Sequence, residues 1–83
     1  MGAVHPPVWY KDAKKKVDAN EKAYWQYIKQ WPHAFRVGTW VFFQDCKLLK
    51  QDASSPEDAL EGSTDSGYLV QHGVPPKILH FYK

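Results

Sequence analysis

Hydrophobic residues recur at helical spacing between residues 10 and 31. At roughly 100° per residue they share one stripe, formed by Tyr10, Ala13, Val17, Tyr24, Tyr27, Ile28 and Trp31. Four lysines lie on the opposite face, at positions 11, 15, 22 and 29, and Asn20 is the one polar interruption of the stripe. Asp12 is a candidate N-cap, and Pro32 stops or bends a helix at the residue before it. The pattern predicts an amphipathic helix over residues 11–31.

Residues 33–50 fit two periodicities. Strand-like alternation joins Phe35, Val37, Thr39, Val41 and Phe43. A helical face would instead be formed by Phe35, Gly38, Val41, Phe42, Cys46, Leu48 and Leu49. The segment is longer than the roughly 4–8 residues typical of a strand. We therefore predict a second helix over 33–50, leaving the first at a Pro32 corner, with a short strand as the alternative.

The connector over residues 51–67 is acidic and carries helix-boundary signals. Ser55 reads as an N-cap, Pro56 as the first helical residue, and Asp58 stands at the capping-box position. Gly62 supplies a stop signal. These residues predict one short helix over 56–61.

Both ends of the chain read as extended arms. His5-Pro6-Pro7 disfavours helix in residues 1–10, and Gly73-Val74-Pro75-Pro76 interrupts the apolar segment 68–83. The predicted fold class is mainly α. It consists of one small chain with a long amphipathic helix, a proline corner, a second helix, a short capped helix and extended N- and C-terminal arms, with little independent core.

The aromatic content argues for a docking surface. The chain has 83 residues, of which 16% are Trp, Tyr or Phe, and a single cysteine that excludes an internal disulfide. Two helices at a corner cannot bury so many large side chains against each other, and surplus apolar surface marks a binding site. The predicted partner-binding residues are Trp9, Tyr10, Val17, Tyr24, Tyr27, Ile28, Trp31, Phe35, Phe42, Ile78, Leu79, Phe81 and Tyr82.

The charge pattern gives little support to nucleic-acid binding. The net charge is +2, and the five acidic residues of segment 51–66 offset the excess of lysine in the first fifty residues. Lys14, Lys15 and Lys16 lie near Trp9 and Tyr10, but most lysines of the helix fall opposite its aromatic stripe. Because stacking and phosphate contacts require both on one surface, we do not expect a nucleic acid to bind.

No motif points to catalysis. The four histidines lie in four different segments without metal-ligand spacing, and Cys46 stands in an apolar stretch. The carboxylates of Glu57, Asp58 and Glu61 belong to a polar connector, whose sequence predicts contact with water rather than a pocket suited to acid–base catalysis. We predict that the protein is not an enzyme and holds no cofactor and no metal.

The sequence therefore favours a non-catalytic accessory subunit that docks on other protein subunits of a large assembly. Our first hypothesis is a mitochondrial inner-membrane respiratory or ATP synthase complex, with the chain peripheral to the membrane and open to contact with its surface. No stretch reaches the roughly 20 apolar residues of a transmembrane span. One alternative is a strap on a microtubule, an axoneme or a ribosome, and a second is a free-standing regulatory binding module. Either alternative allows a cytoplasmic location.

Overall fold

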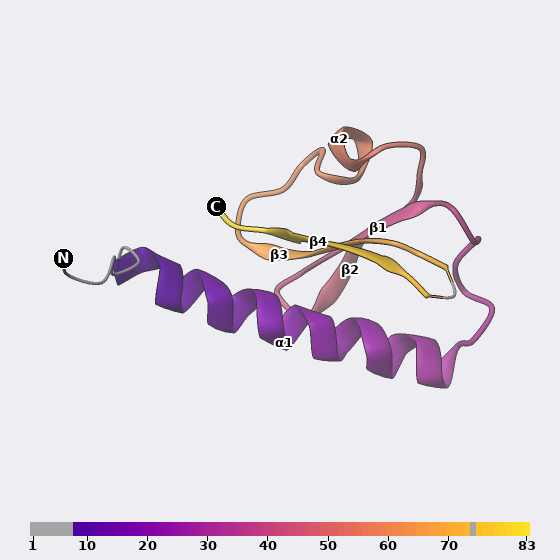
Figure 1. Cartoon of the computed structure of the whole chain (residues 1–83), viewed down its shortest axis with the longest axis horizontal. Helices are drawn as coiled ribbons and strands as arrows, with labels where there is room; N and C mark the ends of the chain where they lie inside the picture. Colours follow the sequence, from indigo (N-terminus) through magenta and orange to yellow (C-terminus); the bar gives the residue numbers. More distant parts are fainter. Residues whose placement is uncertain (1–7, 74) are drawn as a thin grey trace, which may run out of the picture.

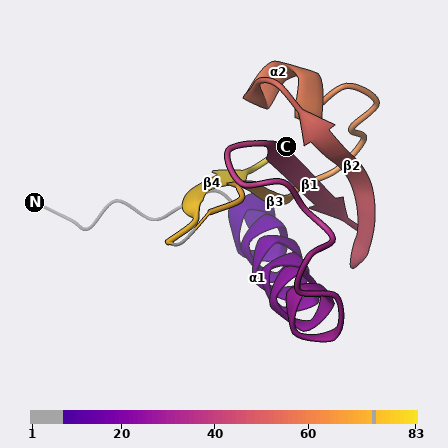
Figure 2. The same ribbon diagram turned by 90° about the vertical axis from the view of Figure 1, so that its right-hand side faces the viewer.

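A computed structural model describes residues 8–73 and 75–83, which form two helices and one antiparallel sheet (Figure 1). The elements, in chain order, are α1 (Val8–Gln30), β1 (Trp40–Gln44), β2 (Lys47–Ala53), α2 (Pro56–Ala59), β3 (Gly67–Gln71) and β4 (Lys77–Phe81). The four strands lie in the order β2-β1-β3-β4. In Figure 2, α1 covers one face of the sheet and α2 lies on the other side.

Helix α1 confirms the predicted amphipathic helix and its end. The backbone nitrogen of Trp31 still donates to the carbonyl of Tyr27 at 2.8 Å, and Pro32 follows directly. The helix begins at Val8, earlier than the candidate cap at Asp12. Residues 8–10 are thus helical, whereas the first seven residues of the predicted N-terminal arm lie outside the described part of the chain.

The predicted helix over 33–50 is wrong, because this segment forms the hairpin of β1 and β2. Asp45 and Cys46 join the strands with φ values of 56° and 58°, and Gln44 pairs with Lys47 across the turn. Two successive positive φ values define a type I′ turn, whose twist matches that of paired strands. The alternation of β-branched and aromatic residues in β1 therefore indicated the correct secondary structure.

The C-terminal segment is a second hairpin, not a free strap. β3 pairs with β1 on one side and with β4 on the other, both antiparallel. Residues 72–76, which carry the proline pair, connect the two strands. The expectation of an extended backbone is confirmed, but β4 pairs with β3 of the same chain instead of forming a free arm.

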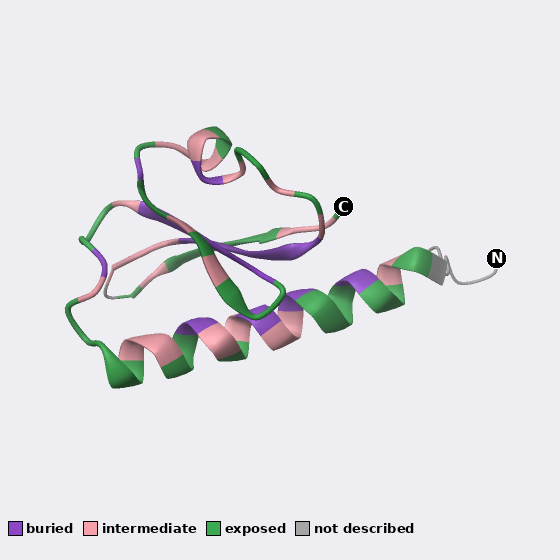
Figure 3. Ribbon diagram, turned by 180° about the vertical axis from the view of Figure 1, so that it is seen from behind, coloured by how far each residue is buried: buried purple, intermediate pink, exposed green. Residues whose placement is uncertain are grey.

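The predicted mainly α fold with little independent core is wrong, because two clusters of buried side chains lie one on each face of the sheet. Figure 3 marks buried residues on the strands and on α1. Against α1 lie Val17, Tyr24, Phe35, Val41, Phe43, Tyr68 and Val70. Toward α2 lie Trp40, Phe42, Ala53, Ala59 and Leu69. A central strand buries both of its faces, which is why β1 reads as a continuous apolar run.

Helix α2 confirms the predicted capped helix with a shorter span. The Ser55 side chain accepts a hydrogen bond from the backbone nitrogen of Asp58 at 3.1 Å, and Pro56 begins the helix. Gly62, at a φ of 83°, lies just beyond its end. Across residues 8–73 and 75–83, neither helix combines the length and hydropathy needed to cross a membrane.

Candidate protein-binding surface

The structure divides the predicted partner-binding residues into three groups. Val17, Tyr24, Phe35 and Phe42 are buried core residues. Partly buried positions are held by Tyr10, Tyr27, Ile28, Phe81 and Tyr82. The exposed members are Trp9, Trp31, Ile78 and Leu79. The helical stripe therefore packs mainly on the sheet, and the exposed members lie at the two ends of α1 and on β4.

Stacked aromatic rings pack at the C-terminal end of α1. The ring of Phe35 lies parallel to those of Tyr27 and Tyr24, at centroid distances of 5.2 and 6.1 Å. Phe43 of β1 meets Phe35 edge to face at 6.3 Å. Offset parallel and edge-to-face arrangements are the favourable geometries for aromatic rings. The stack fixes residues 31–35, where the chain turns from the helix toward the sheet.

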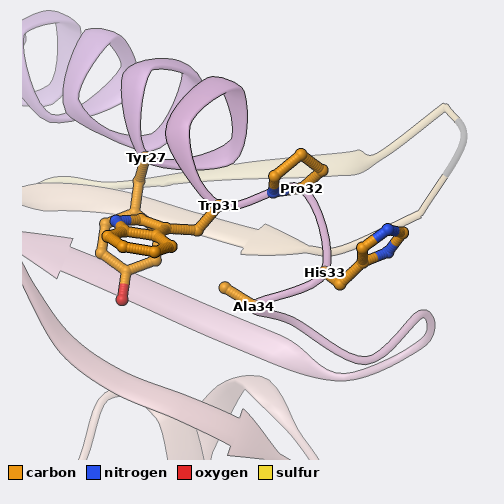
Figure 4. A pocket seen from close by; sticks show the side chains of 5 residues that line it. All are labelled: Tyr27, Trp31, Pro32, His33 and Ala34. Atoms are coloured by element: carbon orange, nitrogen blue, oxygen red, sulfur yellow. The ribbon is translucent and has the colours of Figure 1, made fainter.

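An apolar hollow opens beside this stack. Tyr27, Trp31, Pro32, His33 and Ala34 line a cavity of about 400 Å³ (Figure 4). The hollow exists because Pro32 ends the helix, while the backbone nitrogen of Ala34 donates to the carbonyl of Trp31 at 3.2 Å and turns the chain back. We call these five residues the Trp31 pocket. Its lining suits a large apolar side chain. Its two titratable side chains are Tyr27 and His33, and the ring of His33 points away from Tyr27 in Figure 4.

A second hollow lies on the other side of Tyr27, between α1 and the first hairpin. Its volume is about 340 Å³, and its walls are formed by Ala23, Gln26, Tyr27, Gln30, Phe43, Cys46, Lys47 and Leu48. Amide and ammonium groups make this hollow more polar than the Trp31 pocket. Tyr27 lines both hollows, so the two lie next to each other.

The basic cluster of α1 is partly neutralised within the chain. Lys16 donates to both carboxylate oxygens of Asp65, at 3.0 and 2.8 Å. This hydrogen-bonded pair raises the pKa of Lys16 and lowers that of Asp65. Lys14 lies 3.4 Å from Asp18 one helical turn away. The cluster thus offers less free positive charge to phosphates than its sequence indicates.

The histidine and cysteine side chains that the structure describes do not converge on one point. Within residues 8–73 and 75–83, no group of three histidine, cysteine, aspartate or glutamate residues is arranged to hold a metal ion. His72 shares a hydrogen bond of 2.8 Å with the hydroxyl of Tyr24, and burial lowers the pKa of its ring. Cys46 is exposed in the turn between β1 and β2.

Sequence reasoning missed several residues that shape this surface. Trp25, although 44% exposed, falls outside the helical stripe and was not expected on a binding surface. The sequence marks Pro32 only as a helix stop, whereas Pro32 also lines the Trp31 pocket. Asn20 is buried, donating to the carbonyl of Lys16 and accepting from the backbone nitrogen of Cys46, both within 2.8 Å. The sequence does contain a signal for this buried role, because Asn20 is an isolated amide within an apolar stripe.

Fold and surface together describe a small α+β domain with an apolar hollow at one end of its long helix. Comparisons with protein-family models, with curated proteins and with solved structures found no match to this chain.

Proposed function

We propose that this chain is a small, self-folding, non-catalytic module that binds a protein partner through the Trp31 pocket. The observation that carries the proposal is an apolar hollow that the core does not need. Tyr27 belongs to the aromatic stack, while Trp31 is 56% exposed and closes no part of either buried cluster. Exposed tryptophan beside a hollow is typical of sites where a few side chains dominate binding energy.

The chemistry of the pocket indicates what it binds. Two aromatic rings, a proline and an alanine offer apolar contact, and the Trp31 indole N–H can donate one hydrogen bond. A peptide segment that presents an aromatic or large aliphatic side chain fits this lining. We infer no reaction, because the pocket gathers no pair of a nucleophile and a base.

A free-standing module now suits the chain better than a strap. Both the accessory-subunit and the strap hypotheses depend on a surplus of aromatic side chains that the chain cannot bury, and the sheet buries many of these side chains. A self-folding domain can still be a permanent subunit of a larger complex. The accessory subunit peripheral to the mitochondrial inner membrane therefore stays a prediction, in which the Trp31 pocket would be the contact with the neighbouring subunit.

A random peptide library selected on the immobilised full chain tests the proposal. We expect enriched peptides to share one aromatic or large aliphatic position and to bind Trp31→Ala at least about tenfold more weakly, the loss of a modest hot-spot residue. Trp9→Ala is the matched control, since Trp9 is 54% exposed at the other end of the same helix.

Affinity measured by titration, with folding of each variant checked by circular dichroism, decides the outcome. Peptides that bind Trp31→Ala and the unaltered chain equally well would contradict the proposal. So would a selection that yields no consensus position.

A further inference from the structure

Strand β4 forms an edge of the sheet with apolar side chains on both faces. Ile78 is 45% exposed opposite Val70, and Leu79 is 46% exposed opposite Leu69. Across residues 8–73 and 75–83, no strand pairs with the outer side of β4. An unpaired apolar edge is a template for another strand.

The other edge of the sheet is protected and β4 is not. β2 carries Lys47 and Lys50, its pairing with β1 contains register shifts, and Asp52 has a φ of 57°. Charges and bulges of this kind prevent edge-to-edge pairing. The β3–β4 ladder runs in unbroken register, and Lys77 is the only charged residue of β4 apart from the titratable His80. The contrast selects β4 as the edge that is able to accept a strand.

The direction of the β4 backbone follows from two sets of hydrogen bonds. Lys83 points both its N–H and its C=O at the hydroxyl of Ser66, and backbone direction alternates along an antiparallel strand. His72, beyond the end of β3, likewise turns both backbone groups toward the segment before β1. Both observations leave the N–H and C=O groups of Ile78 and His80 facing outward.

Three symmetric registers would let these outward groups pair with a second copy of β4. Each register has its two-fold axis at one residue, which then lies opposite the same residue of the second copy. An axis at Ile78 sets His80 against Pro76, whose nitrogen carries no hydrogen. An axis at His80 sets Lys77 against Lys83 of the second copy, and like charges in direct opposition are destabilising.

An axis at Leu79 sets no lysine against a lysine, and it moves the Pro76 conflict beyond the end of β4, where Pro76 faces Tyr82. Ile78 and His80 then exchange their backbone hydrogen bonds with the other copy, and Leu79 meets its own counterpart as a non-hydrogen-bonded pair, in which side chains lie closest. Lys77 comes to lie across from Phe81, an aromatic ring that can accept a cation on its face.

We propose that the protein self-associates as a two-fold symmetric dimer through antiparallel β4–β4 pairing centred on Leu79. The sheet becomes continuous across the two copies, and both α1 helices lie on the same face of it. This self-complementary interface is of the isologous kind that closes at two copies. The dimer does not depend on the Trp31 pocket.

Sedimentation of the full chain over a concentration series tests the dimer. A pair of five-residue strands is a small interface, so we expect weak association and would extend the series to about 1 mM. Leu79→Lys opposes two ammonium groups at the axis and is expected to raise the dissociation constant at least about tenfold. Leu49→Lys on β2 is the matched control, because Leu49 is 43% exposed on the other edge and should leave the dimer intact.

Cross-linking tests the register separately. In a Cys46→Ser background, Leu79→Cys is expected to form a disulfide-linked dimer, because Cα atoms of a non-hydrogen-bonded pair lie about 4.5 Å apart, within disulfide reach. Ile78→Cys faces His80 of the second copy and should cross-link much more slowly.

Several results would overturn the proposal. One is a monomer at every concentration, which would leave the β4 edge to an extended segment of another protein. A dimer that Leu79→Lys and Leu49→Lys weaken equally is another. Trp31→Ala should leave self-association unchanged, so failure of the pocket and failure of the dimer can be told apart.

Discussion

Two buried tyrosines differ in what their hydroxyl groups contact. The Tyr24 hydroxyl shares a 2.8 Å hydrogen bond with Nδ1 of His72. The Tyr68 hydroxyl is buried with no hydrogen-bond partner among the described residues. Burial raises the pKa of both, that of Tyr24 to about 12. An unsatisfied buried hydroxyl costs more than a satisfied one, so the two groups contribute differently to stability.

Replacing each tyrosine by phenylalanine measures this difference. Tyr24→Phe should lower the free energy of unfolding by about 1 kcal/mol, because it removes one hydrogen bond and leaves the ring in place. Tyr68→Phe should leave stability unchanged or raise it by up to about 1 kcal/mol, since a desolvation penalty disappears. Urea denaturation followed by circular dichroism measures both. A larger loss for Tyr68→Phe than for Tyr24→Phe would contradict the assignment.

The first hairpin depends on a turn whose second residue, Cys46, does not favour it. Both Asp45 and Cys46 adopt positive φ values, which an L-residue other than Asn, Asp or Gly adopts at a cost. The side chain of the buried Asn20 accepts a hydrogen bond from the backbone nitrogen of Cys46 and holds the turn against α1. Tertiary contact therefore compensates for poor turn chemistry.

Glycine at the second turn position should relieve the strain. We expect Cys46→Gly to raise the free energy of unfolding by about 1 kcal/mol, because glycine adopts the left-handed region without a Cβ clash and keeps the N–H that Asn20 accepts. Asp45→Gly should gain less, since aspartate tolerates positive φ better than cysteine. Thermal unfolding of the two variants side by side gives the comparison. Equal gains at both positions would show that the side chain of Cys46 carries no particular strain.

The sequence predicted elements formed by local interactions more accurately than elements that depend on contacts between distant residues. The periodicity of α1, the stop at Pro32 and the Ser55 cap of α2 act over a few residues, and each was read correctly. β1 was read as a helix because its alternation is short and its partners, β2 and β3, lie elsewhere in the sequence. Strand pairing depends on those distant partners, so the local pattern left two interpretations open.

The whole domain is expected to unfold in a single transition without a partner, and its stability should depend on pH. Burial lowers the pKa of His72 from 6.5 in the folded chain. The unfolded chain therefore binds this proton at a higher pH than the folded chain, and acid favours unfolding. The free energy of unfolding should fall as pH drops from about 6.5 toward the lowered pKa of His72, and it should be independent of this group well above 6.5.

Denaturation curves at a series of pH values measure this dependence, and His72→Gln is the control that should flatten it. An unchanged slope in His72→Gln would assign the effect to other groups. The depressed pKa of Asp65 adds a separate loss of stability, which begins in the more acidic range around its ordinary value of 3.8.

The candidate sites show the same division between local and tertiary information. Trp31 and Leu79 were expected on a binding surface from their apolar character, and the structure leaves both exposed. Tyr24 and Phe42 were expected there for the same reason, and both are buried. Hydrophobicity alone does not distinguish a core residue from a docking residue, because both avoid water and only the packing decides which is covered.

By itself the sequence determined the position and amphipathic character of α1, the capped turn of α2, the extended backbone of the C-terminal segment and the lack of an internal disulfide. These features follow from side-chain periodicity, backbone restriction by proline and the count of cysteines. Only the tertiary structure decided that residues 40–53 pair as strands, that the stripe of α1 packs on the sheet with Val17 and Tyr24 fully buried, and that the Trp31 pocket and the β4 edge remain open. Each of these outcomes depends on contacts between residues far apart in the chain, whose free energy no local pattern contains.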